Sequence, residues 1–191
     1  MLTRVEGPPT RALRDRAILL VDYAGAFRRS ELAALNIADV EFCTEGLRIH
    51  LGRSKTDQEG MGRKVAVAYS SGAENCPVRA LQAWLTAYGV DRGPLFVDVT
   101  SADWIRHVRI SDRMIARLIK RLAARVGIDP ARVSGHSMRS GFVTAAARLK
   151  HADHAIMRQT GHKKIDTLLR YIREANLFVD NASVGVLDAA F

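Results

Sequence analysis

The sequence's strongest structural signal is a capped amphipathic helix over residues 111–126. Ser111 supplies a hydroxyl suited to the first turn, and Gly127 is suited to the end of the helix. The apolar residues between them recur at helical spacing: Ile115, Leu118, Ile119, Leu122 and Val126. Such a stripe needs a core to pack against, so this part of the chain is predicted to be globular and helical.

Other segments give a mixed fold. Three segments favour strands, at residues 40–42, 47–51 and 65–69. The loop at 52–62 is rich in glycine and charge, and residues 89–110 are predicted to be irregular with a short strand at 95–97. A short helix is predicted to begin at Ser30, which is a suitable N-cap. Further helices are predicted at residues 13–25, 77–88, 137–150, 151–160 and 165–173. The predicted fold class is α+β, mainly helical, with a small antiparallel three-stranded sheet.

The net charge of the chain indicates which kind of partner it binds. The 191 residues contain 29 Lys and Arg against 20 Asp and Glu, a net charge of +9. This excess favours a polyanion such as DNA, although a merely basic protein has the same balance. The sequence has no apolar run of membrane-spanning length and no recognisable signal peptide, so a cytoplasmic location without membrane contact is expected. Cys43 and Cys76 are then expected to be reduced.

Two motifs near the C-terminus carry the chemistry. His136 and Arg139 form an H-x-x-R pair, which on a helix places both side chains on one face and suits a phosphate. Residues 161–171 read GHKKIDTLLRY, in which His162 precedes Tyr171 by nine residues. The first motif alone is common in helices, whereas the second is much more specific.

These motifs, and the order in which they occur along the chain, resemble those of the tyrosine recombinases, also called the phage integrase family. Residues 161–171 are similar to the family's G-H-x-x-I-x-T-x-x-x-Y segment, and residues 28–32, RRSEL, match its R-x-S-E-L motif. The resemblance makes Arg28 the first catalytic arginine, although Ala26 stands where the family often has glycine, which leaves Arg29 as an alternative. Thr160 replaces a more usual leucine and is expected to matter only for packing.

The resemblance implies a division of roles on one DNA phosphate. Tyr171 is the nucleophile, and its phenol needs a positively charged pocket that favours the phenolate. Arg28 and Arg139 would bind the nonbridging oxygens. His162 would donate a further hydrogen bond to the same phosphate.

Two more residues complete the expected catalytic set. His136 is either a base for Tyr171 or another phosphate donor. Lys55, in the Ser-Lys-Thr that follows the second strand, would be the general acid for the 5′ oxygen. Arg53, Arg63 and Lys64 lie near it in sequence, which makes Lys55 the least secure of these assignments. The phosphotyrosyl bond conserves energy, so no nucleotide cofactor is expected. No metal or other cofactor is expected either, because arginines and histidines would stabilise the phosphate.

Other charged residues have open interpretations. The basic face of helix 111–126 either enters a DNA groove or is only solvated; its candidate DNA-binding residues are Arg113, Arg117, Lys120 and Arg121. His151 and His154 have H-x-x-H spacing without a further nearby ligand, so no metal site is expected. Two other functions remain on the same fold: strand relaxation of the type IB topoisomerase kind, and DNA-binding regulation without catalysis.

The resemblance also implies a domain organisation. Residues 1–9 are interpreted as a linker remnant, residues 10–173 as the catalytic domain, and residues 174–191 as a tail that docks on a neighbouring protomer. Family members usually carry an N-terminal core-binding domain, which this chain is expected to lack. The partners implied are double-stranded DNA and a homo-tetramer on that DNA, with a monomer expected in its absence.

Overall fold

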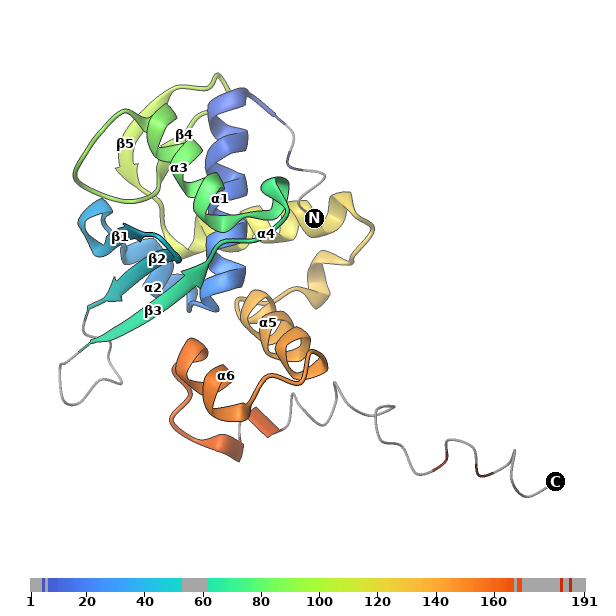
Figure 1. Ribbon diagram of the computed structural model, residues 1–191. Helices are drawn as coiled ribbons and strands as arrows, with labels where there is room; N and C mark the ends of the chain where they lie inside the picture. The colour runs from blue at the N-terminus through green and yellow to red at the C-terminus, as the bar shows by residue number, and fades with distance from the viewer. Residues whose placement is uncertain are drawn as a thin grey trace.

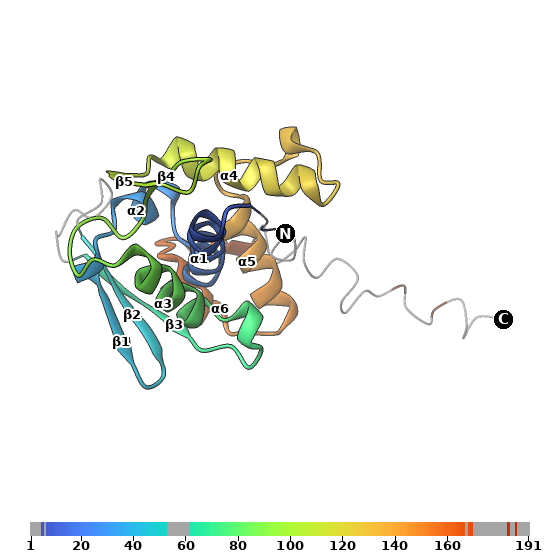
Figure 2. The same ribbon diagram turned by 90° about the horizontal axis from the view of Figure 1, so that it is seen from above.

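One long helix organises the fold. The computed structural model describes residues 5, 7–52, 62–166, 168, 169, 183 and 186. Helix α1 (Pro9–Gly25) runs through the centre, and in Figure 2 it is seen nearly end-on. Three helices surround it: α3 (Pro77–Tyr88), α4 (Asp112–Arg125) and α5 (Ser137–Arg148).

Two further α-helices lie near the C-terminal end of α1, namely α2 (Arg29–Ala34) and α6 (Asp153–Thr160) (Figure 1). Short 3-10 turns cover Ile37–Asp39, Ala73–Asn75 and Pro130–Arg132. The α+β, mainly helical prediction is therefore confirmed. Among the described residues, no helix is long and apolar enough to cross a membrane.

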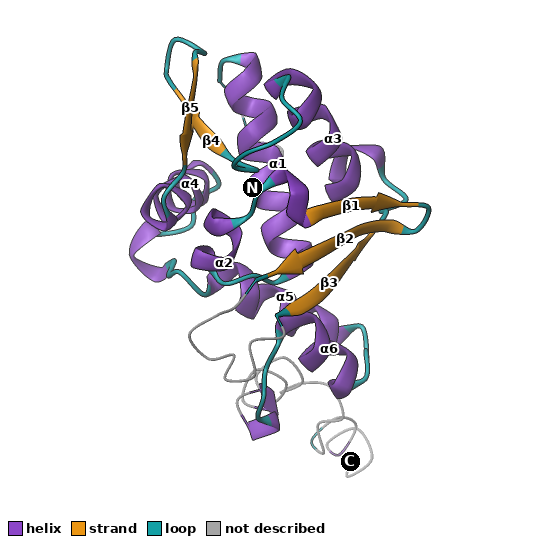
Figure 3. Ribbon diagram, turned by 90° about the vertical axis from the view of Figure 1, so that its left-hand side faces the viewer, coloured by secondary structure: helices purple, strands orange, loops and turns teal. Residues whose placement is uncertain are grey.

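The predicted three-stranded sheet is present and antiparallel. It consists of β1 (Val40–Cys43), β2 (Gly46–Leu51) and β3 (Arg63–Ala68), in that order (Figure 3). In β2 and β3 the apolar side chains face inward, with Ile49 paired to Val65 and both buried. Gly46 has a φ of 151° and lies against the Val67 carbonyl, so a side chain there would clash with the next strand.

The prediction for residues 89–110 was wrong in one respect. A second, two-stranded sheet forms from β4 (Val97–Val99) and β5 (Ile105–Arg109). A register shift lies between Val97 and Val99, and His107 has a positive φ of 54°. These irregularities, together with a mostly exposed β5, remove the alternation by which a strand is recognised in sequence.

Two helix starts also differ from prediction. Helix α1 begins at Pro9, within the expected linker, because the Asp103 carboxylate accepts from the backbone N–H groups of Thr10 (3.0 Å) and Arg11 (2.9 Å). Helix α2 begins at Arg29 and not after a Ser30 cap. Its first turn is closed by Glu31, whose carboxylate accepts from the Arg28 N–H at 2.9 Å.

The main core lies between α1, α3, α4 and the three-stranded sheet. Its largest fully buried side chains include Trp84, Phe27 and Phe96, and Trp84 donates its indole N–H to the Leu95 carbonyl at 2.8 Å. A smaller cluster around Val143, Ile156 and Leu168 packs α5 against α6. The two clusters hold the C-terminal helices beside the end of α1. Cys43 and Cys76 are free thiols, as expected.

Candidate active site

Arg28 is fixed by the carboxylate of Glu31. Its guanidinium donates to Glu31 Oε1 at 2.6 Å, and Glu31 is largely buried. Burial acts to raise the pKa of Glu31, but the Arg28 N–H bond and the charges of Arg63 and Arg28 outweigh it, so the pKa is lowered. Glu31 therefore remains ionised and orients the first arginine.

Arg63, at the start of β3, binds the same carboxylate. Its Nη2 donates to Glu31 Oε2 at 3.1 Å, and its Nη1 donates to the Gln159 carbonyl at 2.8 Å. The guanidinium also lies against Gly161, where a Cβ would come within 2.9 Å of Arg63 Cζ. Arg63 and Glu31 thus belong to the site, although neither was assigned a role in it from the sequence. The available signals were the place of Glu31 in the R-x-S-E-L motif and the position of Arg63 near Lys55.

Arg139 reaches the site from α5. It is only 5% exposed, and its Nη1 donates to the Ala26 carbonyl at 2.8 Å. Ala26 follows α1 in the left-handed conformation, with φ 48° and ψ 43°. This conformation explains why glycine suits the position in the family, and it directs the carbonyl toward Arg139.

His162 follows α6 after one left-handed residue. Gly161 has a φ of 69°, and its N–H and that of His162 both donate to the Met157 carbonyl, at 2.7 and 3.2 Å. The imidazole Nδ1 lies 2.8 Å from Thr160 Oγ1. The expectation that Thr160 matters only for packing is therefore wrong.

The charges of three arginines act on the His162 imidazole. Burial lowers the pKa of His162 to about 4, and the positive charges of Arg139, Arg28 and Arg63 act in the same direction. At neutral pH the imidazole is therefore uncharged. Guanidinium groups from three elements, namely α5, the start of α2 and β3, are therefore close enough for their charges to act on a neutral histidine.

His136 is placed differently from its motif partner. It is the N-cap of α5 rather than a residue within the helix, and it is exposed whereas Arg139 is buried. Its backbone is held by Ser134 and Ser140: Ser134 Oγ accepts from its N–H at 3.2 Å, and its carbonyl accepts from Ser140 Oγ at 2.8 Å. The H-x-x-R pair thus contributes one buried and one solvent-facing group.

Arg29, the alternative to Arg28, points elsewhere. Its guanidinium lies against Gly135, where any side chain would overlap it. It also acts on Asp22, a buried carboxylate of α1 whose pKa burial raises to about 7 against the opposing charge of Arg29. This placement supports Arg28 as the arginine next to His162.

Two predicted catalytic residues, Lys55 and Tyr171, lie outside the described residues. The described chain stops at Gly52 before the first and at Leu169 before the second. Within the described parts, no three His, Cys, Asp or Glu side chains gather as a metal site. His151 and His154 are both exposed.

The basic face of α4 divides into two groups. Arg113, Arg117 and Lys120 are exposed, as a DNA-contacting face requires. Arg121 instead donates to Asp15 of α1 at 2.7 Å, and Asp15 is only 4% exposed. Arg121 therefore has a structural role within the domain in addition to any contact with DNA.

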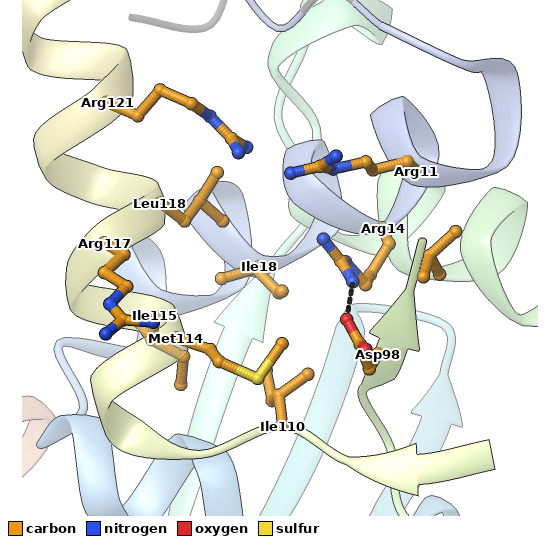
Figure 4. A pocket seen from close by; sticks show the side chains of 11 residues that line it. Arg11, Arg14, Ile18, Asp98, Ile110, Met114, Ile115, Arg117, Leu118 and Arg121 are labelled. Atoms are coloured by element: carbon orange, nitrogen blue, oxygen red, sulfur yellow. Dashed lines mark ion pairs between the residues drawn. The ribbon is translucent and has the colours of Figure 1, made fainter. Parts of the chain in front are cut away.

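Figure 4 shows the pocket beside this ion pair, between α1 and α4. Its volume is about 180 Å³, and Arg11, Arg14, Arg117 and Arg121 contribute to its wall. Arg14 is buried and donates to the Val97 carbonyl at 3.1 Å, while its charge lies 3.9 Å from Asp98. These contacts tie α1 to the β4–β5 hairpin.

Comparison with known proteins agrees with this fold and identifies the family. The family model of the phage integrase family matches residues 3–177. An integrase/recombinase xerD homolog of Selenomonas ruminantium is 41% identical over 170 residues, covering 89% of this chain and 50% of that protein. The tyrosine recombinase XerD of Xanthomonas axonopodis pv. citri (strain 306) is 32% identical over 168 residues, covering 83% and 50%.

Solved structures show the same architecture. A XerH site-specific recombinase in a post-cleavage complex with a palindromic difH substrate superposes with a TM-score of 0.77 at 17% identity, covering 98% of this chain and 49% of that one. A XerA recombinase superposes with a TM-score of 0.66 at 27% identity, covering 87% and 56%. The fold is that of a tyrosine recombinase catalytic domain. The chain belongs to the phage integrase family, and it spans about half the length of the curated relatives it matches.

Proposed function

We propose that this chain is the catalytic domain of a site-specific DNA recombinase or integrase, which cuts and rejoins DNA through a 3′-phosphotyrosyl bond to Tyr171. The observation that carries the proposal is that Arg28 and Arg139, from two separate segments, lie near enough for their charges to act on His162 of a third segment. A cluster of always-charged donors around a half-buried imidazole is suited to a phosphate that gains charge in its transition state.

The chemistry follows from these groups. Arg28 and Arg139 stabilise the nonbridging oxygens while the Tyr171 oxygen attacks phosphorus and the bond to the 5′ oxygen breaks. Lys55 gives that oxygen its proton, and His136 acts as base or as another phosphate donor. The new phosphotyrosyl bond replaces the broken phosphodiester, so a 5′-hydroxyl can reverse the reaction without a nucleotide cofactor.

The relatives favour strand exchange over strand relaxation. The matching proteins carry the names integrase, recombinase and tyrosine recombinase, and XerH was solved on a DNA substrate. The catalytic side chains also argue against a regulator without catalysis. Double-stranded DNA is accordingly the proposed substrate, and exposed Arg113, Arg117 and Lys120 its proposed contacts on α4.

The assembly belongs to the same proposal. We infer a cytoplasmic enzyme that is monomeric alone and tetrameric on two DNA sites. Its tail, residues 174–191, docks on the neighbouring protomer. Apart from Ser183 and Val186, which are exposed, the tail lies outside the described part of the chain, and the proposal rests on family resemblance and the apolar composition of the tail.

The test uses nicked suicide duplexes taken from the genomic neighbourhood of the gene. The chain should form a DNA adduct that survives denaturation, in the presence of excess EDTA, and Tyr171→Phe should abolish it. Tyr69→Phe, at an exposed tyrosine, is the matched control and should cleave normally. An adduct that persists in Tyr171→Phe, or cleavage that requires added magnesium, would overturn the mechanism.

A further inference from the structure

Thr160 places a buried hydroxyl beside the histidine of the site. It is the last residue of α6 and is 0% exposed. Its Oγ1 lies 2.7 Å from the Ile156 carbonyl and 2.8 Å from His162 Nδ1. A leucine, the more usual residue in the family, could make neither hydrogen bond. The hydroxyl is therefore a feature that this sequence adds to the site.

The hydrogen bonds of this hydroxyl determine which ring nitrogen carries a proton. A threonine hydroxyl has one hydrogen, and a carbonyl oxygen can only accept. The 2.7 Å contact with the Ile156 carbonyl therefore takes the hydroxyl hydrogen, as threonines in helices commonly do toward the carbonyl four residues back. Thr160 Oγ1 is then an acceptor toward His162, so Nδ1 must be the donor.

The surroundings of the ring agree with this arrangement. A neutral imidazole with hydrogen on Nδ1 has a lone pair on Nε2. The charged groups that act on the ring are Arg139 from α5, Arg28 from the start of α2, and Arg63 from β3, and guanidinium groups only donate. The nearby carboxylate, Glu31, is already bound by Arg28 and Arg63. Lys163 and Lys164, the next residues in the chain, add positive charge. An accepting Nε2 fits these surroundings better than a donating one.

We propose that Thr160 is a positioning residue that holds His162 as its Nδ1–H tautomer, so that His162 must take up a proton at Nε2 before it can donate to a DNA phosphate. The proton comes from solvent, and the new bond is Nε2–H; Nδ1–H stays on Thr160 throughout. The phosphate charge offsets the three arginines and raises the pKa of His162 when DNA binds. This inference rests on the proposed function for the identity of the phosphate, but the tautomer itself does not.

The first test needs no DNA. In the full chain labelled with ¹⁵N-histidine, the protonated and bare ring nitrogens have well-separated shifts, and His162→Gln identifies the signals. At pH 7 the wild type and Thr160→Ser should show hydrogen on Nδ1. Thr160→Val, which keeps the shape and removes the hydroxyl, should move hydrogen to Nε2. A wild-type spectrum with hydrogen on Nε2 overturns the proposal, whether or not the valine variant folds.

The second test uses cleavage of a nicked duplex as a function of pH. The wild-type rate should fall about tenfold per pH unit above the pKa of bound His162, because the donor is then lost. Thr160→Val should lose this alkaline decline, because a neutral ring with hydrogen on Nε2 can already donate, while Thr160→Ser should keep it. Identical profiles for wild type and Thr160→Val overturn the proposal. If wild type forms no adduct at any pH, the proposed function fails, and the nitrogen spectra still decide the tautomer.

Discussion

Arg63 Nη1 donates to the Gln159 carbonyl at 2.8 Å and thereby joins β3 to the end of α6, three residues before His162. The same guanidinium binds Glu31, which orients Arg28. One arginine thus fixes the relative positions of two candidate catalytic groups that lie far apart in the sequence.

Replacing Arg63 should therefore impair cleavage more than DNA binding. In Arg63→Ala, His162 and Arg28 lose their common support, and a displacement of about 1 Å can cost on the order of 100-fold in rate. Arg63→Lys should recover little, because an ammonium cannot bridge both partners in the guanidinium geometry. Adduct formation and DNA affinity would be measured side by side. Arg48→Ala, which breaks the exposed ion pair between Arg48 of β2 and Glu41 of β1, is the control. Equal losses of affinity and rate would contradict the positioning role.

Asp22 should make the protein less stable as pH rises. Its Oδ1 is buried without a hydrogen-bond partner among the described residues, and burial raises its pKa from 3.8 to about 7. The folded state holds this proton up to about pH 7 and the unfolded state only to about pH 4, so stability falls across that window. Above pH 7 this difference in pKa lowers the free energy of unfolding of the wild type by about 4 kcal/mol, and Asp22→Asn should remove that destabilisation.

Urea unfolding at pH 5 and pH 8 checks this expectation. Asp22→Asn should be more stable than wild type at pH 8, and the advantage should shrink at pH 5. Asp91→Asn, at an exposed carboxylate, should change neither value by more than a few tenths of a kcal/mol. The same difference between Asp22→Asn and wild type at both pH values would show that Asp22 does not carry the proton.

Exposed Arg113 and ion-paired Arg121, both on α4, should respond differently to replacement by alanine. Arg113→Ala should weaken DNA binding and reduce the slope of log affinity against log salt by about one, with unchanged unfolding. Arg121→Ala should instead lower stability by about 1 kcal/mol, because buried Asp15 loses one of its partners. Thermal unfolding and binding at several salt concentrations measure both effects. A larger salt effect for Arg121 than for Arg113 would place Arg121 on the DNA.

Lys55 should behave as the general acid. Lys55→Ala should cleave normal DNA about 10²- to 10⁴-fold more slowly. A substrate whose leaving oxygen is replaced by a 5′-bridging sulfur should largely rescue it, because sulfur leaves without a proton. Lys64→Ala is the comparison and should resemble wild type on both substrates. Equal defects of Lys55→Ala on both substrates would exclude Lys55, and Lys64 would become the next candidate.

The parts of the fold predicted best are those determined by local sequence. Helix α4 begins after its Ser111 cap and ends before Gly127, because cap and apolar stripe lie in one segment. The start of α1 could not be predicted in this way, since its cap is Asp103, more than 90 residues away. Strand β5 was missed because its side chains are mostly exposed and its backbone is irregular.

In the candidate site, too, residues within local motifs could be predicted, whereas those defined by long-range contacts could not. Arg28, Arg139 and His162 were found because each lies in a short motif of fixed spacing, and the structure brings them together. Arg63 was not recognised, because its role depends on contacts with α2 and α6 that are visible only in the folded chain. The role of Thr160 cannot be predicted from its usual leucine equivalent, because leucine only packs whereas the Thr160 hydroxyl bonds to His162.

The side chain of Gln159 has a consequence for folding order. Its amide nitrogen donates to the carbonyls of Ala24 at 2.7 Å and Ala66 at 2.9 Å, which are 135 and 93 residues away in the chain. Contacts over such separations form late, because long loops must close before they contribute free energy. Helices should therefore appear early in refolding, while the catalytic centre assembles only in the final step. Recovery of helical circular dichroism is then expected to precede recovery of the proposed DNA cleavage, and we expect no cleavage by a nascent chain before α6 has docked.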